Sequence, residues 1–205
     1  MKTAPNICES LLAQSGLRPV AGIDEAGRGP LAGPVVACAL VLPEGLIIEG
    51  VNDSKKVTAL RREKLAAIIK ENAVAYAFGI VDAAEIDRIN ILRATLLAME
   101  QAVSALEVEG QALRPRVALV DGTIAPVCPC PVIYIVKGDS LCHLIAAASI
   151  LAKVERDTIM EDLHKKYPEY GFDKHKGYGT AAHREALRQH GLCPQHRRSF
   201  CRAFL

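Results

Sequence analysis

The hydrophobic and polar positions of the first eighty residues alternate between strand-like and helix-like patterns. Two apolar runs, residues 20–25 and 33–42, are joined by a glycine-rich loop and predict strands. Residues 58–73 place apolar side chains at helical spacing, with Thr58 as the expected N-cap. A third strand is predicted over residues 74–81.

The middle of the chain predicts a helical region followed by two more strands. Asp82 and Glu85, three residues apart, form the pattern of a capping box and open a helical region that reaches about Leu106. Residues 116–122 and 132–138 are short, rich in β-branched residues and bounded by Pro or Gly. We therefore expect both to be buried strands.

Two helices are expected in the last third of the chain. The longer one runs over residues 140–167 and is stopped by Pro168, and the other runs over 179–191 and ends at Gly191. The whole order predicts an α/β fold, a mixed central sheet with helices on both faces. We expect one domain over residues 1–205, with a core at about 18–168 and a basic C-terminal helical extension at about 169–205.

Composition narrows the class of protein. Half of the 205 residues are hydrophobic, which is enough for a substantial core, whereas Trp is absent and aromatics make up 4%. Scarce aromatics disfavour a stacking platform for single strands. The seven cysteines are odd in number and irregularly spaced, which favours reduced thiols. Without a signal-peptide pattern or an apolar run near 20 residues, we expect a soluble cytoplasmic protein without membrane contact.

Charge is distributed unevenly along the chain. From His164 to Leu205 there are nine lysines and arginines against three acids, a net charge of +6, which leaves −4 for the rest of a chain whose total is +2. A basic end beside an acidic remainder suggests a polyanion that docks next to a cluster of carboxylates. A solvated basic helix explains the same charges equally well.

Acidic residues stand at the ends of three predicted strands. Asp24 and Glu25 close the first strand, Asp121 closes residues 116–121, and Asp139 follows 132–138. Asp139 alone fits an N-cap and Asp121 alone fits a turn before Gly122, so neither is decisive. The adjacent Asp24 and Glu25 are harder to explain, because ionised carboxylates at the edge of a core are costly unless they are paired or bind metal.

These four carboxylates together predict an all-oxygen site for Mg²⁺ or Mn²⁺, with two ions per site. One difficulty is that neighbouring residues on a strand point to opposite faces, so Asp24 and Glu25 cannot both reach one ion from a regular strand. We therefore expect the strand to be distorted at Glu25, or Glu25 to contribute its backbone carbonyl.

Six motifs occur in an order that resembles bacterial ribonuclease HII, the type 2 ribonuclease H. They are GIDEAGRGPLAGPVVACALVL (22–42), NDSKK (52–56), VDG (120–122), KGDSLCHLIAAASILAKVERD (137–157), HKGYGT (175–180) and HRRSF (196–200). The resemblance implies a ribonuclease H-like fold and a metal-dependent endonuclease. Such an enzyme cuts the RNA strand of RNA–DNA hybrids and nicks 5′ of ribonucleotides embedded in duplex DNA, leaving 5′-phosphate and 3′-hydroxyl ends.

The resemblance also implies roles for individual residues. Asp24, Glu25, Asp121 and Asp139 would hold the metals, with Asp24 bridging them. The loop Gly27, Arg28 and Gly29 would lie against the ribose at the junction, and Tyr178 would pack on the sugar of the following deoxynucleotide. The implied purposes are removal of misincorporated ribonucleotides and trimming of replication primers.

The remaining motif residues are less specific. Ser54, Lys55 and Lys56 are candidate phosphate contacts, although an exposed basic turn has the same pattern. Arg197 and Arg198 either contact the nucleic acid backbone or pack the C-terminus, and the sequence does not separate these roles. Asp157 lies 18 residues beyond Asp139, about 27 Å along a continuous helix, so we assign it to structure.

Partners and rival functions complete the sequence prediction. We expect a monomer, and a sliding-clamp partner is disfavoured because Arg198 stands where a clamp-binding peptide needs an aliphatic anchor. One rival is a DNA nuclease or resolvase, which would cut all-DNA substrates. The other is a non-catalytic nucleic-acid binder whose acids hold structural metal.

Overall fold

The computed structural model describes residues 3–124 and 126–204, apart from the side chains of residues 13 and 56. The strands are β1 (Val20–Ala26), β2 (Val35–Val41), β3 (Ala75–Val81), β4 (Glu107–Val108), β5 (Gln111–Ala112), β6 (Val117–Asp121) and β7 (Val132–Ile135). The helices are α1 (Ile7–Gln14), α2 (Ala59–Asn72), α3 (Ala83–Ile89), α4 (Ile91–Ser104), α5 (Gly138–Leu141), α6 (His143–Lys166), α7 (Phe172–His175), α8 (Ala181–His190) and α9 (Arg198–Cys201). Short 3-10 turns are η1 (Ser54–Lys56), η2 (Pro168–Tyr170) and η3 (Arg202–Phe204).

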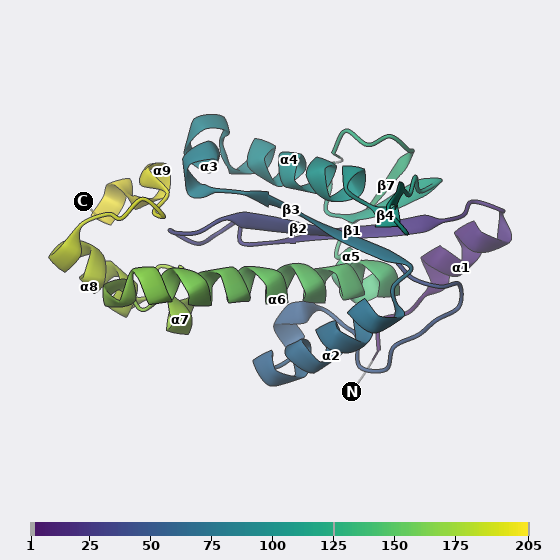
Figure 1. The fold of residues 1–205 in the computed structure, drawn as a ribbon, viewed down its shortest axis with the longest axis horizontal. Helices are drawn as coiled ribbons and strands as arrows, with labels where there is room; N and C mark the ends of the chain where they lie inside the picture. The colour runs from purple at the N-terminus through teal and green to yellow at the C-terminus, as the bar shows by residue number, and fades with distance from the viewer. Residues whose placement is uncertain (1–2, 125, 205) are drawn as a thin grey trace.

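A mixed sheet in the order β3-β2-β1-β6-β7 lies between two layers of helices (Figure 1). β1 pairs with β2 antiparallel and with β6 parallel, and β7 continues the parallel part. α4 covers one face, while α6, backed by α2, covers the other. The expected α/β architecture, with helices on both faces of a mixed sheet, is confirmed.

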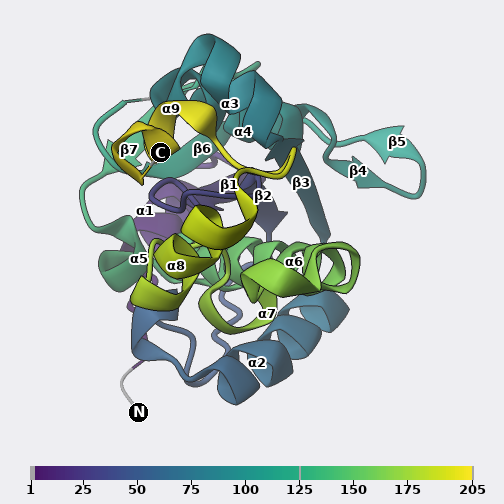
Figure 2. The same ribbon diagram turned by 90° about the vertical axis from the view of Figure 1, so that its left-hand side faces the viewer.

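The C-terminal helices gather at one end of the sheet, beyond the loop that joins β1 to β2 (Figures 1 and 2). Their small core contains Met160, Tyr170, Phe172 and Leu187, and it also takes in Leu31 of that loop. Backbone hydrogen bonds secure the junction, because Leu31 N–H donates to Gly177 O at 2.8 Å and Arg197 N–H donates to Leu31 O at 2.8 Å. The extension thus packs directly on the loop that follows the first acids.

The long helix expected over residues 140–167 is interrupted. Cys142 has extended backbone angles (φ −134, ψ 121) and separates α5 from α6. The first amides of α6 are satisfied by the N-terminal segment, since His143 N–H donates to Pro5 O at 2.7 Å and Leu144 N–H donates to Glu9 Oε1 at 2.6 Å. A carboxylate at a helix N-terminus is a favourable cap. These capping groups lie more than 130 residues away in sequence, where local pattern reading does not find them.

Other predicted elements differ in detail. The helical region after Asp82 is split at Asn90 (φ 71), whose side chain caps α4 by accepting from Arg93 N–H. Thr58 occupies the N-cap position of α2, but its side chain makes no capping hydrogen bond. A strand does form within 132–138, but the prediction that it is buried is wrong. β7 is a shorter strand at the edge of the sheet, and Tyr134 on it is exposed.

Several short elements were not predicted individually. They are α1, the hairpin of β4 and β5 that projects from the molecule in Figure 2, α7 and α9. Each is short, and local periodicity is weak in such segments. Across the described residues, no helix is both long and apolar enough to cross a membrane.

Candidate functional site

Two acids lie side by side where β1 and β6 end their pairing. The parallel register ends at Ile23 opposite Val120, and Asp24 and Asp121 come next on their strands. Gly22 lies tightly against Leu144 of α6, so alternation along β1 directs Asp24 to the same face of the sheet. The Asp24 carboxyl is buried there, with 6% of the residue exposed.

Asp121 fixes the position of a third acid. Its Oδ1 accepts a hydrogen bond of 2.6 Å from Gly138 N–H, the first residue of α5. Asp139 is the next residue and is also buried. A Cβ at Gly138 would lie 3.4 Å from Asp121 Oδ1 and 2.6 Å from Ile145 Cδ1, so glycine favours this close approach, and a larger residue would displace the Ile145 side chain.

The carboxylates repel one another inside a poorly solvated site. The pKa of Asp24 is raised well above its ordinary value by burial and by the charges of Glu25, Asp121 and Asp139, although a hydrogen bond from the Glu25 backbone opposes the shift. Burial raises the pKa of Asp139, and so does the neighbouring carboxyl of Asp53, while the Lys55 ammonium lowers it. The cluster therefore carries more negative charge than its local cations balance.

The chemistry of these donors fits a hard divalent cation. All of them are carboxylate oxygens, which Mg²⁺ and Mn²⁺ prefer, and a bound cation would relieve the repulsion that raises their pKa values. Within residues 3–124 and 126–204, no three Asp, Glu, His or Cys side chains stand ready as a preformed metal centre. Binding of a cation at this cluster would therefore require the carboxylate side chains to move toward one another.

Glu25 does not distort its strand. β1 keeps regular pairing through Glu25 opposite Ala37 and Ala26 opposite Val36, so the expected distortion is wrong. The Glu25 carboxyl nevertheless stays close to the other acids. Burial and the charge of Asp121 raise its pKa, while Arg28 and a side-chain interaction with Asp24 oppose the shift, and its Oε1 lies 3.5 Å from Arg28 Nη1. The alternative, metal binding through the Glu25 backbone carbonyl, stays a prediction.

The glycine loop and Tyr178 come together beside the acids. Gly27 has φ +99, and a Cβ there would collide with the Arg156 side chain and lie 2.7 Å from Pro34 O. A Cβ at Gly29 would lie 3.9 Å from Tyr178 Cε1, which places the tyrosine ring against this part of the loop. Tyr178 is 45% exposed, so part of its surface is open to a ligand.

Two buried arginines hold the loop by its carbonyl groups. Arg197 donates to Gly27 O at 2.7 Å, Arg28 O at 3.0 Å and Gly33 O at 2.8 Å. Arg156 donates to Pro34 O, Ala32 O and Lys176 O, and its guanidinium lies 6.0 Å from the centre of the Tyr178 ring. Burial and the nearby Arg156 lower the pKa of Arg197 to about 9.

This burial decides between the two roles left open for Arg197. Its side chain is fully buried, so the predicted direct contact with nucleic acid is wrong and the packing role is correct. Arg198 is exposed instead, and its backbone N–H donates to Asp87 Oδ2 at the start of α9. A substrate contact through the Arg198 side chain stays a prediction.

The turn η1 brings Lys55 toward the acids. Asp53 caps the turn by accepting from Lys55 N–H at 3.0 Å, and the exposed Lys55 acts electrostatically on Asp139. Ser54 is mostly buried and its N–H donates to Ser149 Oγ at 3.3 Å, so its hydroxyl presents little surface to a phosphate. The side chain of Lys56 lies outside the described residues.

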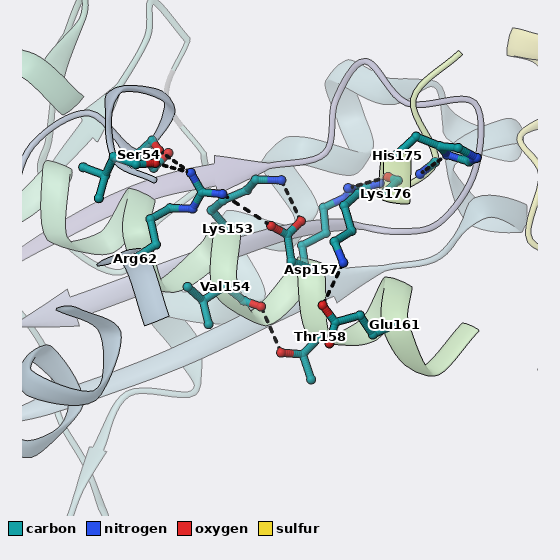
Figure 3. A network of polar contacts seen from close by, with 12 residues as sticks. Ser54, Arg62, Lys153, Val154, Asp157, Thr158, Glu161, His175 and Lys176 are labelled. Atoms are coloured by element: carbon teal, nitrogen blue, oxygen red, sulfur yellow. Dashed lines mark hydrogen bonds and ion pairs between the residues drawn. The ribbon is translucent and has the colours of Figure 1, made fainter. Parts of the chain in front are cut away.

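A polar network ties η1 to α6 (Figure 3). Arg62 donates to Ser54 O at 2.8 Å and Val57 O at 2.5 Å, and its Nη2 lies 3.8 Å from Asp157 Oδ2. Lys153 Nζ donates to the other oxygen of Asp157 at 2.6 Å. The assignment of Asp157 to structure is confirmed by these contacts.

Sequence reasoning missed three residues of this region: Asp53, Arg62 and Arg156. Asp53 sits inside the NDSKK motif, and its acid could have been noted there. Arg156 likewise sits inside the motif of residues 137–157 and could have been noted there, whereas Arg62 lies outside all six motifs and has the pattern of an ordinary surface residue on a helix.

The sequence matches a known protein family over most of its length. The family model for ribonuclease HII matches residues 21–203. The chain belongs to the ribonuclease HII family. It is accordingly a ribonuclease H hydrolase, and the recognition made from the six motifs is confirmed.

Its relatives span most of the chain. A ribonuclease HII of Delftia acidovorans is 59% identical over 88% of this chain and 75% of that protein. The ribonuclease H2 structure from Pyrococcus horikoshii has a TM-score of 0.73 at 31% identity and covers 90% of this chain and 96% of that one. The ribonuclease HII in a PCNA complex from Archaeoglobus fulgidus has a TM-score of 0.71 at 28% identity, over 87% and 93% of the two chains.

Replacing Asp24 with asparagine should stabilise the metal-free protein. The raised pKa means that the charged form costs folding free energy at any pH above the ordinary Asp value, and asparagine removes the charge while it still accepts from Glu25 N–H. In chelator at pH 7.5 we expect the melting temperature of Asp24→Asn to rise by about 2–4 °C for each ~1 kcal/mol of relief. The gain should shrink as the pH falls through the raised pKa of native Asp24, and it should vanish near the ordinary Asp value, where the unfolded chain is protonated as well.

The matched control is Asp162→Asn, because Asp162 is exposed and its pKa is lowered by Lys165. This control should leave the melting temperature unchanged or slightly lower. A melting temperature of Asp24→Asn at or below that of the wild type in chelator would contradict the electrostatic description of the cluster.

Proposed function

We propose that this ribonuclease is a divalent-metal-dependent endonuclease that nicks duplex DNA 5′ of an embedded ribonucleotide and cuts the RNA strand of RNA–DNA hybrids. The products would carry 5′-phosphate and 3′-hydroxyl ends. The observation that carries the proposal is the location of the acid cluster beside the loop of Gly27 to Gly29 and the exposed ring of Tyr178. A site suited to phosphodiester cleavage therefore lies next to a surface suited to recognising a sugar.

The cleavage half of the site is formed by acids from three segments. Asp24, Asp121 and Asp139 are the residues that would hold Mg²⁺ or Mn²⁺, with Glu25 contributing from β1. Two such ions, when bound, supply an activated water and neutralise charge on the leaving oxygen. The protein's own part is to gather carboxylates at one strand edge and to orient Asp121 through Gly138 N–H.

The sugar-reading half is formed by backbone groups. Glycines at positions 27 and 29 let a ribose approach the main chain closely, and a 2′-hydroxyl can both donate and accept a hydrogen bond. Because Arg197 and Arg156 engage several loop carbonyls, the backbone groups left for a ligand are held in fixed directions. Tyr178 would pack on the next sugar and disfavour a 2′-hydroxyl there.

Phosphate contacts would align the duplex across this edge. Lys55 is exposed close to Asp139, and Arg198 is exposed in the C-terminal extension. Such contacts make binding fall with increasing salt whatever the base sequence. Cleavage of this kind would serve to remove ribonucleotides from DNA and to trim RNA primers. The prediction of a monomer without a clamp partner is kept, although the related Archaeoglobus fulgidus structure is a PCNA complex.

The proposed reaction is tested with an end-labelled duplex that contains one ribonucleotide, incubated with protein and Mg²⁺ or Mn²⁺. We expect a single nick 5′ of the ribonucleotide, because only that position offers a 2′-hydroxyl to the loop. The nick should disappear with chelator and should fall by at least about a thousandfold in Asp121→Asn, since that change removes a ligand charge.

An all-DNA duplex of the same sequence is the control substrate. Cutting of this control would contradict the proposal and favour the DNA-nuclease alternative. Retention of the duplex on a gel without any fragments in either metal would instead favour a binding protein.

Replacing Tyr178 with alanine should weaken junction cleavage without affecting the acids. We expect a loss of about tenfold or more at the ribonucleotide–deoxynucleotide junction, because the ring no longer packs on the second sugar. The rise in melting temperature on adding Mn²⁺ should match that of the wild type. Tyr76→Ala, at an exposed tyrosine on β3, is the control and should cleave normally. Unchanged junction kinetics in Tyr178→Ala would contradict its assigned role.

A further inference from the structure

Histidines of the C-terminal extension form a hydrogen-bonded chain that ends on the backbone of Tyr178. Cys193 N–H donates to His196 Nδ1 at 3.0 Å. His196 Nε2 lies 3.0 Å from His183 Nε2, and His183 Nδ1 lies 3.0 Å from Tyr178 O. The chain thus links the HRRSF motif to the HKGYGT motif through α8.

The hydrogen-bond partners at the two ends of this histidine chain determine which ring nitrogens carry a hydrogen. Tyr178 O only accepts, so His183 Nδ1 carries a hydrogen and a neutral His183 accepts at Nε2. His196 must then donate from its Nε2, which leaves its Nδ1 free to accept from Cys193 N–H. The longer approach of His196 Nδ1 to Cys193 O, 3.3 Å, would need the other tautomer. One arrangement of neutral imidazoles therefore satisfies every short contact.

A third histidine fixes the residue before Tyr178. His175 Nε2 lies 2.7 Å from Tyr170 O and donates to it, so Nδ1 is the acceptor for Gly177 N–H at 3.2 Å. The His175 ring stacks on that of His183 with centroids 4.4 Å apart. Both the amide preceding Tyr178 and its own carbonyl are thus anchored to imidazoles.

The surroundings keep these rings neutral. His183 and His196 are buried, and Phe172 packs within 5.6 Å of both rings. Burial and the neighbouring His183 lower the pKa of His196 to about 4, and burial also lowers the pKa of His183 and His175. Groups facing His196 from other elements are His175, Tyr170 and the thiol of Cys193, none of which is negative at neutral pH.

We infer that His183 and His196 are positioning residues that set the height of the Tyr178 ring over Gly29, and thereby set the preference for a deoxyribose on the 3′ side of the cut. The inference rests on the proposed function. The geometry supports this inference, because the ring of Tyr178 is exposed while its backbone carbonyl is hydrogen-bonded to the histidine chain. Neither histidine touches substrate in this arrangement, so their effect passes through Tyr178.

The test compares two duplexes that differ at one sugar. In the first the ribonucleotide is followed by a deoxynucleotide, and in the second it is followed by another ribonucleotide. The measured quantity is the ratio of kcat/KM at the same bond in the two duplexes. The variants are His183→Leu, which removes the donor to Tyr178 O, and His183→Asn, whose amide can donate from near the Nδ1 position. His190→Ala, at an exposed histidine on the same helix, is the control.

We expect the wild type and His190→Ala to share one ratio that favours the deoxynucleotide. His183→Leu should lower that ratio by about tenfold, toward the value of Tyr178→Ala, and His183→Asn should restore most of it. Should leucine prevent folding, His183→Gln removes the donor at the Nδ1 position with a polar side chain, and the same fall is expected.

An unchanged ratio in a folded His183→Leu or His183→Gln protein would overturn the inference, even if both rates fall together, because equal losses indicate a purely structural role. Failure of the wild type to nick either duplex would instead refute the proposed function. The two failures are therefore distinguishable.

Discussion

The arrangement of the site depends on two buried guanidinium groups that bind backbone carbonyls. Arg197 and Arg156 reach carbonyl groups along the β1–β2 loop from Gly27 to Pro34, and Arg156 also reaches Lys176 O. Hydrogen bonds from a charged donor are stronger than neutral ones, and loss of one partner from such a buried set is costly. The loop and the segment that carries Tyr178 are consequently held as one unit beside the acids.

The acids themselves oppose folding. Asp24 is buried among carboxylates whose charges, together with burial, raise its pKa, so the metal-free protein carries a repulsive cluster where β1 and β6 end their pairing. Packing elsewhere compensates, because β1 and β2 are buried almost throughout between α4 and α6. This pattern is common at functional sites, where local strain is retained because the chemistry requires it.

Local sequence patterns were sufficient to predict most of the central strands and the acids at their ends. Strand periodicity located β1, β2, β3 and β6, and strand-end acids pointed to Asp24 and Asp121, which the structure places side by side. Contacts between distant residues were not accessible in this way. The break before α6 depends on Glu9, and the packing role of Arg197 depends on carbonyls about 165 residues earlier in the chain. Strand distortion at Glu25 was inferred from a ligand requirement, but the regular pairing with β2 determined the backbone.

The most direct test of the account is a crystal structure of the Asp121→Asn protein bound to Mg²⁺ and a DNA duplex that contains one ribonucleotide. The account predicts the scissile phosphate beside Asp24 and Asp139, the 2′-hydroxyl against the backbone of Gly27 to Gly29, and the Tyr178 ring on the following sugar. A duplex bound with its 2′-hydroxyl directed to solvent, or with Tyr178 away from the sugar, would contradict the claim that this loop selects the ribonucleotide.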